Sequence, residues 1–387
     1  MAKRGRNEGS IFKRRDGRWV GSLNLGWENG RRKRIHFYAS NAGEVQAQLL
    51  RARSDHSLGL PVAVHHQTVE QFVRHWLEYT LKPRAKPRSF ESFSTVSRLH
   101  IFPTLGRIQL KKLFPQHVQK LLDQKLKSGL SAQTVTNIRT VLRSALAQAV
   151  KWNLVARNAA ALVDAPRIPR KKIEPLDPAG ARKLLEVAAG HRFESLLNVA
   201  LMLGLRRGEV LGLRWADLDL ELRTLHVSQS IQRLQTGSLE PKRKSELRAT
   251  DTKTDGSRRT IALPDSVVRA LRVQRGYQAE QRLLAGPDWQ DHGLVFTNGT
   301  GRPIEPIILH RDYKALLQKA GLPTTLRFHD LRHSTATLLM AQGVHPRAIM
   351  ELLGHSSITV TMNVYGHVLP AMMRDAAAKM DAIFDNV

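Results

Sequence analysis

The sequence predicts a multidomain protein: a small N-terminal domain of three strands and one helix, an all-α middle domain, and a mainly α (α+β) C-terminal domain. Three observations lead to this prediction. The length of 387 residues, 42% of them hydrophobic, exceeds what one hydrophobic core usually supports. Strand-like patterns are confined to the N-terminal end and two later stretches, and helical spacing dominates elsewhere. A basic, proline-rich connector at 165–175 is unable to pack and marks the main boundary.

The first domain is expected over residues 1–60, after a basic tail at 1–9. An Asp16-Gly17 turn and an Asn29-Gly30 turn separate short strand-like segments, which is a hairpin signal. A helix then follows and is expected to back the sheet. The strands and the helix are expected at 10–13, 18–25, 31–37 and 42–57.

The second domain is expected over residues 66–164 and is entirely helical. Thr68 is placed as an N-cap with Gln71 three residues later, which is the spacing of a capping box. Apolar residues then recur at helical spacing until Pro83 to Pro87 break the helix. Further helices, each with an apolar stripe and a basic face, are expected at 89–102, 115–127 and 131–151.

The third domain is expected over residues 173–387. A helix starts from Asp177, and a long apolar helix follows at 192–204. Strands are expected near 224–234 and 257–263, with a long loop at 235–251 between them. Helices are expected from there to the end of the chain.

The charge of the chain indicates a polyanionic partner. Lys and Arg number 61 against 33 Asp and Glu, a formal net charge of +28. Residues 1–170 carry 31 basic and 10 acidic residues, so this half is expected to grip DNA. No apolar run is long enough to span a bilayer, and no secretory signal is present. The absence of cysteine excludes disulfides and thiolate metal sites and fits a cytoplasmic location.

The basic run Arg31 to Arg34 has two interpretations. It can be a charged edge strand that resists aggregation, or part of a sheet face that lies against DNA. The second interpretation is favoured by three more arginines on the neighbouring strands, Arg14, Arg15 and Arg18.

Two short polar clusters near the C-terminal end hold the first candidate catalytic residues. His329 and Arg332 stand three residues apart in Phe-His-Asp-Leu-Arg-His, so they share one helix face. His355 lies in a turn-like Gly-His-Ser-Ser segment, and Tyr365 follows it by ten residues. Groups of these types can hold a phosphodiester and attack it with a phenol.

Two upstream cations complete the candidate set. Arg206 ends an apolar stretch and precedes Glu209 by three residues, so Glu209 can orient its fork toward two phosphate oxygens. Lys253 adjoins an Asp255-Gly256 turn that can aim one ammonium at a bound strand. The combined set predicts an enzyme that cuts and joins DNA.

Taken singly, each candidate has a less specific interpretation. Arg206 can simply form a buried ion pair with Glu209, and Lys253 can be a surface lysine. His355 can cap a helix, and Tyr365 can be an ordinary amphipathic tyrosine.

A zinc site is the competing interpretation of the histidines. His329 and His333 stand at i and i+4, as in zinc metalloprotease helices. Asp330 replaces the general-base Glu of that motif, and Arg332 would set a cation beside the metal. Metal binding is therefore disfavoured.

The combination resembles the tyrosine recombinases of the phage or mobile-element integrase type. Their pattern is an Arg in a Gly-[Leu/Met]-Arg-x-x-Glu context, a hairpin Lys, His-x-x-Arg, and Leu-Gly-His followed by a Tyr about ten residues on. It is matched in order by Arg206, Lys253, His329, Arg332, His355 and Tyr365. The neighbouring Lys242 and Lys244 leave the identity of the hairpin lysine open. Residues 9–57 resemble an arm-site-binding domain, and the helical domain resembles a core-site-binding domain.

The resemblance implies a mechanism. Tyr365 would attack the scissile phosphate, form a 3′-phosphotyrosyl link and release a 5′-hydroxyl. Arg206 and Arg332 would neutralise charge in the transition state, and Lys253 would protonate the leaving oxygen. His329 would assist proton transfer at the nucleophile, His355 would hydrogen-bond a phosphate oxygen, and no metal or other cofactor would be needed.

The resemblance also implies partners. They are double-stranded DNA with core-type and arm-type attachment sites, and further copies of the chain in a tetramer on DNA. A host protein that bends DNA and an excisionase are possible accessory partners. The protein is expected in the cytoplasm of a bacterial host, associated with the nucleoid. The tail stripe Met373, Ala377, Met380 and Phe384 can pack on its own domain, but it is expected to dock into a neighbouring protomer.

Three other functions compete with this one. A tyrosine-class topoisomerase shares the chemistry, but an arm domain argues against it. A non-catalytic DNA-binding regulator with the same fold is disfavoured by the complete residue set. A metal-dependent nuclease lacks the paired carboxylates that such sites need.

Overall fold

The computed structural model describes residues 10–28, 31–57, 67–169, 174–236, 244–251 and 258–354. The chain divides into two compact units, residues 1–169 and 170–387. The expected multidomain fold class is confirmed, with a small sheet domain and a helical domain in the first unit and a mainly α domain in the second.

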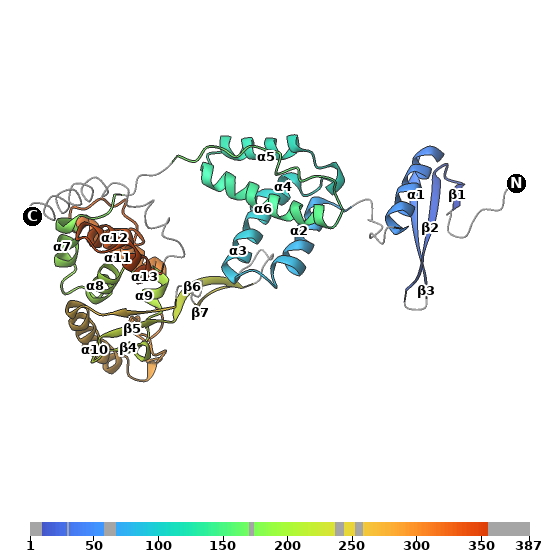
Figure 1. Cartoon of the computed structure of the whole chain (residues 1–387). Helices are drawn as coiled ribbons and strands as arrows, with labels where there is room; N and C mark the ends of the chain where they lie inside the picture. The colour runs from blue at the N-terminus through green and yellow to red at the C-terminus, as the bar shows by residue number, and fades with distance from the viewer. Residues whose placement is uncertain are drawn as a thin grey trace, which may run out of the picture. The chain divides into compact units, whose positions relative to one another are not determined.

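A three-stranded antiparallel sheet forms the start of the first unit. Strands β1 (Ser10–Lys13), β2 (Trp19–Glu28) and β3 (Arg31–Ala39) lie in that order, and helix α1 (Ala42–Ser57) covers one face (Figure 1). Gly21 makes this cover possible, because a Cβ there would lie 2.6 Å from side-chain atoms of both Val45 and Leu49. The helix therefore packs directly on the strand, over a core of Leu23, Phe37, Val45, Leu49 and Ala52.

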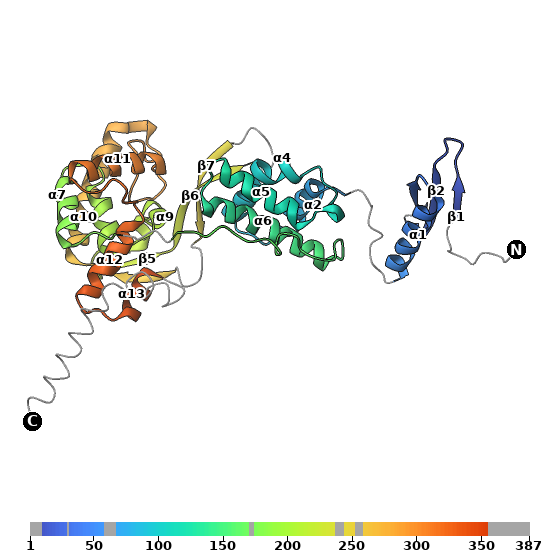
Figure 2. The ribbon, with the colours of Figure 1, turned by 90° about the horizontal axis from the view of Figure 1, so that it is seen from above.

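Helices make up the described remainder of the first unit. The capping box predicted from the sequence is present: Thr68 Oγ1 accepts from Gln71 N at 3.3 Å, and Gln71 Oε1 accepts from Thr68 N at 3.0 Å. Figure 2 shows α5 and α6 side by side. The elements are α2 (Val69–His75), the π-helical turn η1 (Trp76–Leu81), α3 (Pro87–Val96), the π-helical turn η2 (Ser97–Ile101), α4 (Phe102–Leu105), the 3-10 turn η3 (Leu110–Lys112), α5 (Pro115–Lys127) and α6 (Ala132–Lys151).

The second unit is built around the apolar helix α8 (Glu194–Leu203). Most of its side chains are buried, and it contacts the flanking helices α7, α9, α10 and α12. The other helical elements are α7 (Pro178–Val187), α9 (Arg207–Leu211), the 3-10 turn η4 (Trp215–Asp217), α10 (Asp265–Ala285), the 3-10 turn η6 (Gly286–Asp288), α11 (Pro306–Lys319), α12 (Asp330–Ala341) and α13 (Pro346–Leu353).

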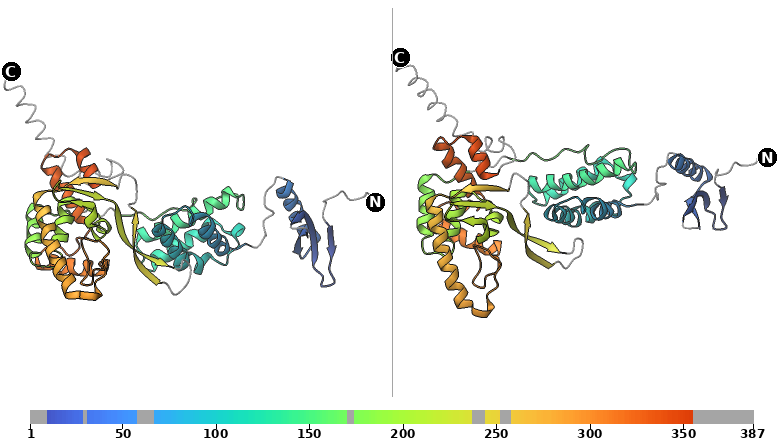
Figure 3. Two further views of the ribbon diagram at one scale, coloured as in Figure 1. Left: turned by 90° about the horizontal axis from the view of Figure 1, so that it is seen from below. Right: turned by 60° about the horizontal axis from the view of Figure 1, so that its bottom comes forward.

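In the described residues of the second unit, five strands accompany these helices. Strands β4 (Leu218–Asp219), β5 (Thr224–Val227) and β8 (Arg259–Ala262) form one antiparallel sheet. Strands β6 (Gln229–Thr236) and β7 (Lys244–Asp251) form a separate two-stranded ribbon (Figure 3). The single strand expected near 224–234 is thus two, divided at Ser228, whose hydroxyl donates to Asp217 and accepts from Arg214.

The prediction of a loop at 235–251 is wrong. Residues 244–251 form β7, which pairs with β6 from Thr236↔Lys244 to Gln229↔Asp251. The sequence hides this strand because it is charged and lacks β-branched residues at most positions. Pairing with β6 supplies its backbone hydrogen bonds instead. In the part of the chain that the structure describes, no helix has the length and apolarity needed to cross a membrane.

Candidate active site

Arg206 stands at the N-cap of α9, where α8 has just ended. Its backbone N–H donates to Glu209 Oε2 at 3.0 Å, and its Nη1 donates to Glu209 Oε1 at 2.6 Å. Its Nη2 donates to the carbonyl of Gly354 at 2.9 Å. The ion pair with Glu209 therefore exists, and it also holds the guanidinium in one orientation. About a third of the Arg206 side chain (32%) stays exposed, whereas Glu209 is 3% exposed.

Arg332 lies in the first turn of α12 and is almost entirely buried, with 2% exposure. Its Nη1 donates to the carbonyl of Gly204 at 2.9 Å, two residues before Arg206. Thr335, one turn further along α12, donates to the carbonyl of Leu201 at 2.5 Å. These two contacts fix the start of α12 against the end of α8, so both predicted arginines meet around one backbone segment.

Gly204 allows three helices to meet at this point. It ends α8 in the left-handed conformation, with φ of 60°. A Cβ at this position would lie 2.4 Å from Leu353 Cδ2 and 3.3 Å from Thr335 Cβ. A second left-handed glycine, Gly354 with φ of 66°, ends α13 and turns its carbonyl toward Arg206. Glycine is needed at both ends because other residues are strained there.

His329 is the N-cap of α12, one residue before the helix begins. Solvent reaches part of its ring, yet packing around it and the nearby His333 and cations lower its pKa to about 4. Arg332 and Arg206 are among those cations. His329 is therefore neutral at pH 7 and able to accept a proton.

His329 and His333, the two histidines of the zinc interpretation, lie edge to face. The ring centroids of His329 and His333 lie 5.4 Å apart with an interplanar angle of 83°. Asp330 stands at the position of the general base in a metalloprotease, but its Oδ1 accepts a hydrogen bond from Arg327 Nη2 at 2.7 Å. Within the described residues, no group of three or more His, Cys, Asp or Glu side chains is placed to hold a metal ion.

Sequence analysis did not single out Arg259, which the structure brings to Glu209. Arg259 Nη2 donates to Glu209 Oε2 at 3.1 Å, and its Nε donates to the carbonyl of Leu352 at 2.6 Å. Strand alternation is a signal that could have found it. Arg259 shares one face of β8 with Ile261, which is buried, so it must point inward.

Three of the six predicted site residues lie outside the described residues. They are Lys253, His355 and Tyr365. Lys253 belongs to the connection between β7 and β8, and His355 directly follows the described Gly354. The predicted tail stripe from Met373 to Phe384 also lies outside the described residues.

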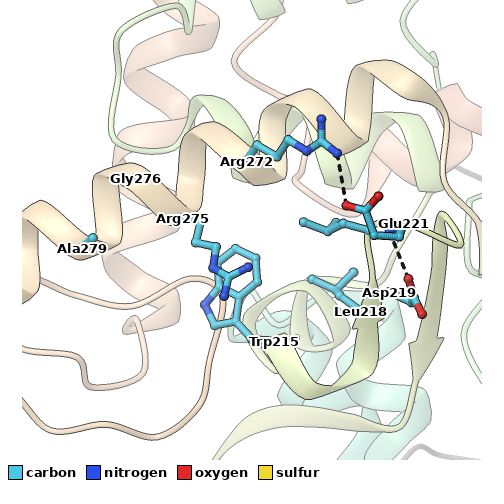
Figure 4. A pocket seen from close by; sticks show the side chains of 9 residues that line it. Trp215, Leu218, Asp219, Glu221, Arg272, Arg275, Gly276 and Ala279 are labelled. Carbon is cyan, nitrogen blue, oxygen red and sulfur yellow. Dashed lines mark hydrogen bonds and ion pairs between the residues drawn. The ribbon is translucent and has the colours of Figure 1, made fainter.

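A hollow of about 730 Å³ lies elsewhere in the described part of the chain. Figure 4 shows Arg275 over the ring of Trp215, with 5.8 Å from its Cζ to the ring centroid, and Arg272 paired with Glu221. The site residues that the structure describes, Arg206, His329 and Arg332, do not line it. The candidate site thus lies where the ends of α8 and α13 meet the start of α12. Such a site suits a surface that binds a large polymer.

Known proteins resemble this chain over most of its length. A model described as the phage integrase family matches residues 175–372, and a phage integrase N-terminal SAM-like domain matches residues 68–126. An integrase from Streptomyces ambofaciens is 31% identical over 99% of this chain and 98% of its own length. A XerC-like tyrosine recombinase from Caldanaerobacter subterraneus subsp. tengcongensis is 30% identical over 92% of this chain and 94% of its own.

Solved structures share the fold. The Tn1549 transposon integrase in complex with transposon right end DNA has a TM-score of 0.67 and 21% identity, covering 80% of this chain and 99% of that one. A lambda integrase dimer bound to a core site has a TM-score of 0.57 and 16% identity, covering 77% and 95%.

Proposed function

This chain belongs to the phage integrase family and is a tyrosine-type site-specific DNA recombinase, and we propose that Arg206 and Arg332 hold the scissile phosphate while Tyr365 attacks it. The observation that carries the proposal is the meeting of both arginines at the end of α8. Arg206 is oriented by Glu209, and Arg332 is anchored on the Gly204 carbonyl. Planar guanidinium forks match phosphate oxygens better than point charges do.

The proposed cleavage step makes one bond and breaks one. Tyr365 Oη attacks phosphorus, the bond from phosphorus to the 5′ oxygen breaks, and the strand stays attached through a 3′-phosphotyrosyl link. The phenol proton passes to His329, and Lys253 protonates the departing 5′ oxygen. His355 donates to a non-bridging phosphate oxygen. Attack of a different 5′-hydroxyl reverses the step and joins the strand to a new partner without another energy source.

The neutral state of His329 supports its part in this scheme. A pKa near 4 leaves the ring unprotonated at pH 7, so it can accept a proton from the nucleophile. Arg332 is 2% exposed, so its contact with a phosphate requires a local opening around the start of α12 when DNA binds.

We assign the remaining parts of the chain by the same proposal. Residues 1–60 would bind arm-type DNA, 66–164 core-type DNA, and 173–387 would carry catalysis and a tail that docks into a neighbour. A tetramer on DNA, with a bending factor and an excisionase, would integrate and excise a phage or other mobile element in a bacterial host. The excess charge of +28 supports extensive contact with DNA phosphates.

A nicked suicide substrate tests the nucleophile. Because a strand cut near the nick loses the short downstream fragment that carries the new 5′-hydroxyl, the covalent intermediate accumulates and can be mapped by peptide mass spectrometry. We expect the adduct on Tyr365, with Tyr365→Phe abolishing it and leaving DNA binding unchanged.

Tyr277→Phe is the matched control. Tyr277 lies on α10 and lines a different hollow, together with Arg192 and Phe193, so this variant should form the adduct normally. Tyr313 is not an alternative nucleophile, since it is fully buried and burial raises its pKa. An adduct that persists in Tyr365→Phe would overturn the assignment. Binding without any adduct in the unaltered protein would favour the regulator.

A further inference from the structure

We infer that Arg259 is a positioning residue of the recombinase: it fixes the guanidinium of Arg206 through the shared carboxylate of Glu209 and anchors the end of α13. The inference rests on the proposed role of Arg206 at the phosphate. Arg259 opens β8, and its side chain is 8% exposed. Its side chain donates to Glu209 and to the Leu352 carbonyl, so it acts through the groups that it contacts.

The first contact is with Glu209, which two arginines share. Arg206 Nη1 binds one carboxylate oxygen at 2.6 Å, and Arg259 Nη2 binds the other at 3.1 Å. Burial alone would raise the pKa of Glu209, but Arg259 and then Arg206 outweigh it, and the pKa of Glu209 is lowered. Glu209 is therefore an anion held from both sides. Without Arg259, the Glu209 carboxylate would be free to rotate toward Arg206, and the Arg206 guanidinium would shift with it.

The second contact is with the C-terminal end of α13. Arg259 Nε donates to the Leu352 carbonyl at 2.6 Å, and Arg206 Nη2 donates to the Gly354 carbonyl at 2.9 Å. Carbonyls at a helix C-terminus lack intrahelical donors and carry partial negative charge, so cations stabilise them. The two arginines hold this helix end together, and the next residue in the chain is His355.

These contacts join segments that are far apart in sequence. Glu209 lies 50 residues from Arg259, and Leu352 lies 93 residues from it. One guanidinium with donors in a fixed plane can make both contacts at once. A lysine ammonium at this position would keep the charge but lose that geometry.

The test measures single-turnover cleavage by Arg259→Gln and Arg259→Lys on three substrates. The first has an ordinary scissile phosphate. The second has a methylphosphonate, which is neutral and so needs no charge neutralisation by Arg206. The third has a 5′-bridging sulfur, which leaves as a thiolate and so needs no proton from Lys253. Arg206→Ala and Lys253→Ala are measured beside them.

We expect Arg259→Gln to cleave the ordinary phosphate about 100-fold more slowly, as a misplaced catalytic group does, and Arg259→Lys about tenfold more slowly. The methylphosphonate should reduce the defect of Arg259→Gln to less than about tenfold, and the sulfur substrate should leave it unchanged. DNA binding should be retained. Arg192→Gln also loses an arginine–carboxylate ion pair, with Asp312 at 2.5 Å, although Arg192 is more exposed than Arg259, and it should cleave all three substrates normally.

Each other outcome overturns the inference. A defect of equal size on all three substrates would mean that Arg259 only supports the fold. Rescue by the sulfur substrate alone would mean that it acts on Lys253. If the methylphosphonate rescues Arg206→Ala but not Arg259→Gln, the inference fails while the proposed function stands. If it does not rescue Arg206→Ala, the role of Arg206 fails and the inference falls with it.

Discussion

At the scale of single residues, the site depends on how the two arginines are held. Arg332 is anchored on a backbone carbonyl and reaches a phosphate only when the start of α12 opens. Arg206 is partly exposed and is oriented by a carboxylate, so its fork has a fixed direction before DNA arrives. Pre-orientation of this kind lowers the cost of reorganisation in the transition state.

Replacing Arg332 by lysine should slow cleavage sharply while leaving DNA binding nearly intact. The ammonium keeps the charge but cannot bind two phosphate oxygens in one plane, so we expect a loss of about 100-fold or more in the single-turnover rate. Arg347→Lys on α13 is the control, because Arg347 forms an exposed ion pair with Glu351. Cleavage by Arg332→Lys at the rate of that control would contradict a bidentate role.

The ring of His329 should titrate far below an ordinary histidine. NMR titration of the DNA-free protein should give a midpoint near 4, because burial, His333 and the cations disfavour the charged ring. Between about pH 4 and 6.5 the unfolded chain then binds more protons than the folded one, so the free energy of unfolding falls as the pH drops through this window. A midpoint at or above 6.5 would show that His329 is not surrounded as described.

At the scale of elements, the ends of helices build the site. The end of α8, the start of α12 and the end of α13 meet around Gly204, whose backbone both turns the chain and accepts from Arg332.

Gly204→Ala should therefore affect stability and activity together. The added Cβ would meet Leu353, which is fully buried and unable to swing aside, so we expect a loss of about 1–3 kcal/mol in the free energy of unfolding. Gly293→Ala isolates the backbone contribution, because Gly293 has a similar φ of 65° and open space around it. Equal losses in both variants, measured by chemical denaturation, would argue against a tight junction at Gly204.

Local sequence patterns predict some of these elements and contacts but not others. The helix 115–127 follows from its apolar spacing, and it is present as α5 between the same residues. Strand β7 was missed because its charges hide a pairing that only β6 reveals. The pairs His329–Arg332 and Arg206–Glu209 are readable since each spans three residues. The contact of Arg259 with Glu209 joins residues 50 positions apart, and no local pattern encodes that distance.

At the scale of the whole molecule, the net positive charge is concentrated in the first 170 residues, which hold 31 of the 61 basic residues but only 10 of the 33 acidic ones. Deleting residues 1–60 should leave cleavage at a core site unchanged and lower recombination between full attachment sites, because arm-type DNA loses its binding domain. The deletion should also reduce the salt dependence of binding to full sites, since fewer counterions are released. Recombination of full sites by the shortened chain at the rate of the whole chain would rule out an arm domain.

The polarity of the covalent link tests the central claim most directly. A suicide substrate labelled at the 5′ end of the cleaved strand is incubated with the protein in EDTA, and the products are separated under denaturing conditions. We predict that the label stays on the protein, since the strand is held by its 3′ phosphate, and that the released fragment carries a 5′-hydroxyl that a kinase can phosphorylate. Cleavage that EDTA abolishes, or that releases a 5′-phosphate and leaves no label on the protein, would contradict recombination through a phosphotyrosine.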